Sequence, residues 1–181
     1  RSCSGWGRAE RLRAIPPARA MPGMTPPRPH PLELKIPPPV VALACALLAW
    51  CLSVALPAWT LPWPGRHWLA GGLVAIGLAL DLSALSAFLR ARTTINPLAP
   101  ARTSSIVRGG AYRFTRNPMY LGLACSLSGL AAWLAHPLAL AGPVLFVAWV
   151  TRFQIVPEER ALRAAFGAPY ADYLRRVRRW L

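Results

Sequence analysis

A segment that combines paired glycines, arginines and a helix-start signal has the residue types of an anion site. Residues 109–122 read GGAYRFTRNPMYLG. Asn117 and Pro118 are of the types that cap and begin a helix. The N-terminus of such a helix offers free N–H groups and a partial positive charge, which suit a carboxylate. Arg113 and Arg116 strengthen this interpretation.

Two adjacent carboxylates, Glu158 and Glu159, follow a later apolar run and suit hydroxyl and cationic groups. Only a two-residue turn separates the apolar runs 119–135 and 138–156, which predicts a tight antiparallel hairpin. The hairpin would bring Tyr120 close to Glu158. Donors would then face acceptors across one pocket, complementary to a zwitterionic amino acid linked to a ribose. The alternative is structural: the arginines set membrane topology and the glutamates stabilise a helix start.

Composition indicates which elements must position these residues. The 181-residue chain is 55% hydrophobic yet has a net charge of +15, which fits a membrane protein whose charge is confined to loops and tails. Long apolar spans interrupt the charge and no nucleic-acid motif is present, so nucleic acid is not expected as a partner. Anionic lipids are the expected partner of the basic charge. The sequence predicts an all-α integral membrane protein with four transmembrane helices, at about 40–56, 68–89, 119–135 and 138–156.

The basic residues predict the orientation. The 90–116 loop and the tail after residue 156 are rich in arginine, whereas the other two connections hold one base, Arg66. The positive-inside rule then places the arginine-rich loop and both termini in the cytoplasm. Residues 157–181 are expected to form a cytoplasmic helical tail. Its second helix would be amphipathic and lie on the membrane, with these residues on one face: Tyr170, Tyr173, Val177 and Trp180.

The N-terminal residues 1–35 are rich in Arg, Pro and Gly without periodicity. They are expected to be disordered, or to be an extension that precedes a true start at Met21 or Met24. The membrane domain would then span residues 36–181.

Three further features bear on function. Asp81 is an ionisable residue inside a span, where such residues are costly and often functional; it would face a substrate cavity or pair with another span. Gly71, Gly72 and Gly77 permit close helix packing, within one chain or between chains. The three histidines are scattered and not at ligand spacing, so no metal site is expected.

Two separated motifs and the hairpin between them resemble the isoprenylcysteine carboxyl methyltransferase and phospholipid methyltransferase superfamily, in its small bacterial form. The matching strings are GAYRFTRNPMYLG and PEERALRAAFGAPYADYLRRVRRW, with RTTINPLAP and LELKIPPPVV upstream. The resemblance covers roughly residues 32–181. It implies a helical membrane enzyme that binds S-adenosylmethionine at the cytoplasmic face and methylates a lipophilic acceptor entering from the bilayer. It also implies a multi-pass protein of the bacterial inner membrane.

The resemblance carries over to particular residues. The family's Arg-His-Pro-x-Tyr element matches Arg116, Asn117, Pro118 and Tyr120, and its Glu-Glu pair matches Glu158 and Glu159. Asn117 stands where many members have His, so an acid–base role at this position would be missing. We expect the cofactor contacts to come from these six residues and from Leu121 and Gly122, with Asn117 mainly contacting cofactor. Acceptor-side roles are expected for Arg113, Arg163 and Asp81.

Two other functions remain open. Membrane sterol reductases carry a related Arg-His-Pro-x-Tyr segment and use NADPH, and a non-catalytic scaffold could retain the fold. The acceptor also stays open among a prenylcysteine-like carboxylate, a phospholipid amine, an isoprenoid acid and a small hydrophobic thiol.

Overall fold

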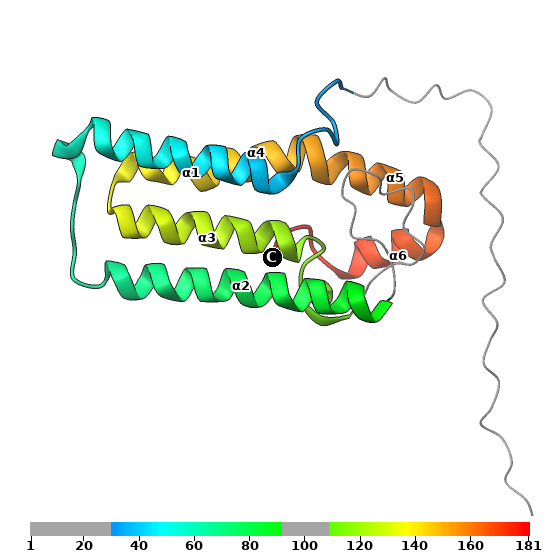
Figure 1. The fold of residues 1–181 in the computed structure, drawn as a ribbon. Helices are drawn as coiled ribbons and strands as arrows, with labels where there is room; N and C mark the ends of the chain where they lie inside the picture. Colours follow the sequence, from blue (N-terminus) through cyan, green and yellow to red (C-terminus); the bar gives the residue numbers. More distant parts are fainter. Residues whose placement is uncertain (1–29, 92–108) are drawn as a thin grey trace, which may run out of the picture.

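The computed structural model describes residues 30–91 and 109–181, and the elements in these ranges are helical. Four helical rods run side by side (Figure 1). They are α1 (Pro38–Ala55), α2 (Arg66–Ala91), α3 (Pro118–Leu134), and a longer rod that begins with η4 (Pro137–Leu140) and α4 (Ala141–Val150). The chain reverses direction between successive rods. Residues 1–29 and 92–108, including Met21 and Met24, lie outside the described residues.

Three of the rods are long and apolar enough to cross a membrane: Pro38–Ala55, Arg66–Ala87 and Pro137–Phe166. They agree with the expected first, second and fourth spans. The third expected span, α3, is apolar but has 17 residues, about 26 Å of helix. The chain is thus a multi-pass membrane protein, and the crossing by α3, together with the orientation, stays a prediction.

Glycine allows α2 and α3 to approach each other closely. A Cβ atom on Gly77 would lie 2.6 Å from the Gly122 carbonyl oxygen, and one on Gly129 would lie 2.9 Å from the Ala70 oxygen. A side chain at either position would therefore force the helices apart. The expectation for Gly71 and Gly72 is wrong within this chain, because a Cβ there would meet nothing within 4 Å.

The core lies between α1, α3 and the fourth rod. Phe146, Val150 and Ile155 are fully buried and pack with Leu127 and Cys45. Many leucines of α1 and α2 are exposed instead, as expected for faces that meet lipid. At the end of the bundle away from α5, the Leu61 N–H donates to the Ala135 carbonyl at 2.8 Å and joins the two loops there.

The fourth rod continues past the expected end of its span. A π-helical turn, Thr151–Ile155, follows α4 and leads directly into α5 (Val156–Phe166). Pro157 has no N–H for the carbonyl of Phe153, four residues earlier. The Leu34 N–H donates to that carbonyl instead, at 3.1 Å. Because an outside donor satisfies this carbonyl, the helix continues through the boundary between span and tail expected at residue 157, and the position of that boundary stays a prediction.

The residues before α1 form part of the folded structure. Glu33 makes ion pairs with Arg152 at 3.1 Å and Arg160 at 3.2 Å, and its side chain is only 7% exposed. The Gln154 side-chain amide donates to the Ile36 carbonyl at 2.6 Å. The domain therefore begins before residue 36, and residues 30–35 do not belong to a disordered extension.

The tail ends differently from the expected amphipathic helix. Gly167, with φ +57°, separates α5 from α6 (Ala168–Arg176). However, α6 ends before Val177, whose backbone is extended. Tyr170 and Tyr173 are buried, and Trp180 packs against the core. The apolar side chains of the tail therefore pack on the protein itself.

Candidate functional site

The two polar motifs of the sequence meet at one end of the bundle. The hydroxyl of Tyr120, in the first turn of α3, donates to Oε1 of Glu158 in α5 at 2.5 Å. This contact confirms that the ends of the third and fourth rods are neighbours, as the short turn between them predicted. Acceptor and donor groups of the two motifs thus share one site.

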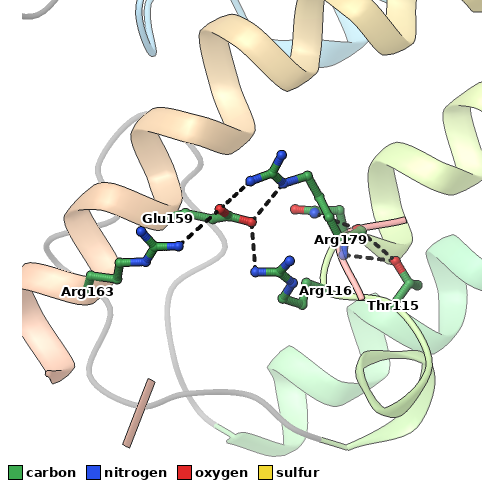
Figure 2. Close-up of polar contacts among 6 residues, drawn as sticks. Thr115, Arg116, Glu159, Arg163 and Arg179 are labelled. Atoms are coloured by element: carbon green, nitrogen blue, oxygen red, sulfur yellow. Dashed lines mark hydrogen bonds and ion pairs between the residues drawn. The ribbon is translucent and has the colours of Figure 1, made fainter. Parts of the chain in front are cut away.

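Glu159 is the centre of a group of charged residues that we call the Glu159 cluster. Figure 2 shows three arginines directed at this one carboxylate. Arg116 lies 3.0 Å from its Oε1, and Arg179 donates through Nε and Nη2 at 3.1 and 2.8 Å. Arg163 is more distant, at 3.9 Å, and its side chain is 59% exposed. The hydrogen bond to Glu159 raises the pKa of Arg179, so this guanidinium stays charged.

The start of α3 lacks a side-chain cap. Asn117 is the N-cap residue as predicted, but its side chain makes no capping hydrogen bond. The side-chain amide instead donates to the carbonyl of Arg179 at 2.9 Å. Within the part of the chain that the structure describes, Nε of Arg116 is buried and has no hydrogen-bond partner. First-turn amides and an unsatisfied guanidinium N–H therefore lie together.

Arg179 is a site residue that the sequence reasoning missed. Its guanidinium reaches Glu159 because the chain after α6 turns back along residues 115–116, where Thr115 and Arg178 form a parallel bridge. The Arg116 N–H donates to the Arg178 carbonyl at 3.0 Å. An arginine among several basic tail residues gave no signal of this long-range contact.

The paired glycines Gly109 and Gly110 form a turn that fixes residues 110–113 against α2. Gly110 has φ +59°, and a Cβ there would lie 2.9 Å from Oγ of Ser83. The Ala111 N–H donates to the same hydroxyl at 3.0 Å. This contact places the 3₁₀ turn η3 (Gly110–Arg113) next to the start of α3.

A cavity of about 580 Å³ lies between η3 and α6. The exposed Arg113 lines it, together with these residues: Tyr112, Pro169, Asp172, Tyr173, Arg176 and Val177. The Tyr173 hydroxyl donates to the Tyr112 carbonyl at 2.9 Å, and the ring of Tyr170 lies 6.1 Å from that of Tyr173. Burial raises the pKa of Tyr170, and the charge of Glu159 raises it further.

Asp81 lies against α3, away from the charged groups of the cluster. A Cβ on Gly122 would clash with the Asp81 carboxylate, so the two residues are in direct contact. Among the described residues, Oδ1 of Asp81 is buried without a hydrogen-bond partner. Pro118 and Gly122 are buried in α3, and Leu121 is half-buried. The structure thus gathers Arg116, Asn117, Tyr120 and both glutamates, whereas Arg113 lines the cavity and Asp81 contacts Gly122.

Comparison with protein families gives these contacts a context. The model of the phospholipid methyltransferase family matches residues 65–169, more than half of the chain. The chain belongs to this family of membrane methyltransferases. The match includes the first motif, the hairpin and the first part of the second motif, up to residue 169, and it confirms the resemblance seen in the sequence. No solved structure matches the chain.

Two curated relatives differ in what they match. An uncharacterized protein of Haemophilus influenzae is 41% identical over 63 residues, which are 35% of this chain and the whole of that protein. Methanethiol S-methyltransferase 2 of Bradyrhizobium diazoefficiens is 37% identical over 122 residues, which are 62% of this chain. The matched part is 42% of that enzyme's length, so the activity of the whole enzyme does not transfer directly.

Proposed function

We propose that this chain is a methyltransferase that uses S-adenosylmethionine and methylates a lipophilic acceptor at the charged end of the bundle. The observation that carries the proposal is the buried, unpartnered Nε of Arg116 beside the uncapped start of α3. A carboxylate would satisfy this N–H and the first-turn amides together. The methionyl carboxylate of the donor is a group of this kind.

The two glutamates divide the remaining contacts. A carboxylate accepts about four hydrogen bonds, and Glu159 has N–H groups of Arg116 and Arg179 on both of its oxygens. Glu158 accepts from Tyr120 and keeps more capacity. We therefore assign the ribose hydroxyls or the ammonium group of the donor to Glu158, and the holding of the arginines to Glu159.

Methyl transfer from S-adenosylmethionine depends more on the relative orientation of donor and acceptor than on proton transfer. When bound, S-adenosylmethionine supplies an activated methyl group on its sulfonium. The residues of this chain would orient the donor at its carboxylate and ribose ends, and the apolar rods would keep water from the acceptor side. Proximity and orientation of this kind supply large accelerations. The Asn at position 117 is compatible with such a mechanism, because no base is needed at the donor.

The acceptor is proposed to reach the site from the bilayer. A thiol is one candidate class, because the Bradyrhizobium relative is named for methanethiol; a prenylcysteine-like carboxylate is the other. Methylation of a thiol releases a proton, and Asp81 is the ionisable group that lies deeper along the same helix pair. Arg113 or Arg163 would instead orient an anionic acceptor. Anionic lipids remain the proposed partners of the basic surface.

The alternatives are weighed by the same observations. The family match is to methyltransferases, which disfavours an NADPH-dependent reductase. Burying Nε of Arg116 without a partner costs free energy. In a non-catalytic scaffold no ligand would offset this cost.

The test of the acceptor uses donor labelled with deuterium in its methyl group. Protein in nanodiscs is incubated with a hydrophobic thiol, a prenylcysteine and a fatty acid, and labelled products are counted by mass spectrometry. The proposal expects transfer to one of these that Arg116→Gln reduces strongly and the exposed control Arg175→Gln leaves unchanged. Absence of label in all products, with bound donor, would refute the acceptor classes.

A further inference from the structure

The last residues of the chain lie at the Glu159 cluster. Val177 leaves α6 in an extended conformation, with φ −120° and ψ 133°. In the C-terminal segment, residues 177–181, Arg178 and Arg179 lie beside residues 115–117, and Figure 2 shows Arg179 next to Thr115 and Arg116. The segment therefore reaches the cluster through its backbone as well as through one side chain.

Two side chains hold this segment by the same atom. The carbonyl oxygen of Arg179 accepts from Nδ2 of Asn117 at 2.9 Å and from Oγ1 of Thr115 at 3.2 Å. Thr115 is 1% exposed, and its hydroxyl also accepts from the Asn117 N–H at 3.2 Å. The hydroxyl and the amide thus fix the backbone from which the Arg179 side chain extends.

We call these two hydrogen bonds to the Arg179 carbonyl the clamp. The clamp determines where the Arg179 guanidinium lies. Arg179 and Arg116 both bind Glu159, so this carboxylate holds two guanidinium groups together. Counting Arg163 as well, one carboxylate faces three positive charges, so positive charge is left for a ligand. Each guanidinium has five N–H donors, of which Arg179 directs two at Glu159. The guanidinium groups of Arg116 and Arg179 can together bind a further carboxylate, and we call this pair the carboxylate seat.

We propose that Asn117 and Thr115 are positioning residues that hold Arg179 in place, so that Arg179 and Arg116 together bind the carboxylate of S-adenosylmethionine. This inference rests on the proposed function. It gives Asn117 a role that differs from the cofactor contact expected from the sequence. The side chain acts through the C-terminal segment, for which an amide donor is suited.

The first arm of the test needs no cofactor. Amide hydrogen exchange of residues 177–181 is measured in wild-type protein and in two matched pairs of variants. Asn117→Asp turns the donor into an acceptor that repels the carbonyl, and Asn117→His keeps a ring N–H. Thr115→Val removes the hydroxyl at equal size, and Thr115→Ser keeps it. We expect exchange to be roughly tenfold faster in the Asp and Val variants only.

The second arm compares two ligands that differ by one group. Titration calorimetry measures the affinity for S-adenosylmethionine and for its decarboxylated analogue. Asn117→Asp, Thr115→Val and Arg179→Gln should weaken the first by about fivefold to tenfold and the second by less than twofold. Asn117→His and Thr115→Ser should restore affinity. Arg175→Gln, an exposed arginine of the same tail, is the control.

Each outcome decides a different claim. Unchanged exchange in the Asp and Val variants would overturn the clamp. Equal losses for both ligands would mean general structural damage and would overturn the carboxylate seat. Wild-type protein that binds neither ligand would refute the proposed function and the seat with it, while the exchange measurement would still decide the clamp.

Discussion

Glu33 and Glu159 are two poorly exposed carboxylates that each bind arginines near the π-helical turn and α5, yet the clusters differ. Glu33 binds Arg152 and Arg160, whose side chains are 54% and 45% exposed. We call these three residues the Glu33 cluster. In the Glu159 cluster, Arg116 is 13% exposed and keeps a buried N–H without a partner in the described residues. The arginines of the Glu33 cluster are open to solvent, whereas Arg116 in the Glu159 cluster keeps a buried N–H that we propose a ligand satisfies.

The difference separates a cluster that only joins parts of the chain from one that, we propose, also binds a ligand. The Glu33 cluster joins the residues before α1 to the fourth rod, beside the Leu34 bond that satisfies the Phe153 carbonyl. The Glu159 cluster joins the fourth rod, the start of α3 and the C-terminal segment. Changes in the first should therefore alter stability alone, and changes in the second should alter both stability and ligand binding.

The largest effect is expected for Glu159→Gln. The variant leaves Arg116 and Arg179 together without a balancing charge, and breaking a buried ion pair costs about 3 kcal/mol of unfolding free energy. Binding of S-adenosylmethionine should be lost as well, because the carboxylate that draws the two guanidinium groups together is gone. Thermal unfolding in nanodiscs and titration calorimetry measure the two effects, with the exposed Asp172→Asn as control. A variant that stays as stable as wild type would contradict the role of Glu159.

The second prediction compares the same substitution in the two clusters. Arg116→Lys keeps the charge but loses the planar fork, so affinity for S-adenosylmethionine should fall at least about tenfold. Arg152→Lys in the Glu33 cluster should leave affinity within about twofold. Calorimetry on both variants measures the contrast. Equal losses in the two variants would remove the distinction between the clusters.

The third prediction is a pH effect on the Glu33 cluster. Burial raises the pKa of Glu33, but the hydrogen bond from Arg152 and the charge of Arg160 outweigh it, so the pKa lies below its ordinary value of 4.5. The ion pairs then stabilise the fold fully above pH 4.5, and this contribution is lost as the pH falls through the lowered pKa. Since both arginines are exposed, we expect Glu33→Gln to cost roughly 1 kcal/mol near neutral pH.

Chemical unfolding of wild type and Glu33→Gln across the acidic range measures this difference. It should be constant above about pH 5 and shrink only below 4.5. A difference that stays constant through the whole acidic range would show that the arginines do not lower the pKa of Glu33.

The smallest effect is expected for Arg163→Gln. Arg163 lies 3.9 Å from Glu159 with a largely exposed side chain, so solvent screens the interaction. Affinity and stability should stay near wild type, in contrast to Arg179→Gln. A loss as large as that of Arg179→Gln would show that all three arginines contribute equally.

The sequence predicted the parts of the fold that follow from local pattern. Apolar runs gave the rods within a few residues, and the short turn at His136 predicted that Tyr120 and Glu158 are neighbours, which the hydrogen bond confirms. Helix start signals placed Asn117 correctly. These features depend on residues close in the chain or on one forced reversal.

The missed features depend on contacts between distant residues. Glu33 and Leu34 complete a helix more than 100 residues away, and Arg179 reaches the site only because the chain extends after α6. Gln154 was a usable signal, because an amide inside an apolar run must find a partner, here the Ile36 carbonyl. No comparable pattern marked Arg179 among the neighbouring arginines.

The measurement that tests the central claim most directly is calorimetric titration of S-adenosylmethionine into wild type, Arg116→Gln and Glu33→Gln in nanodiscs. We predict saturable binding by wild type and Glu33→Gln, and at least a tenfold loss in Arg116→Gln, about 1.4 kcal/mol or more. No binding by folded wild type, or an equal loss in the two variants, would contradict the assignment of the Glu159 cluster as the donor site.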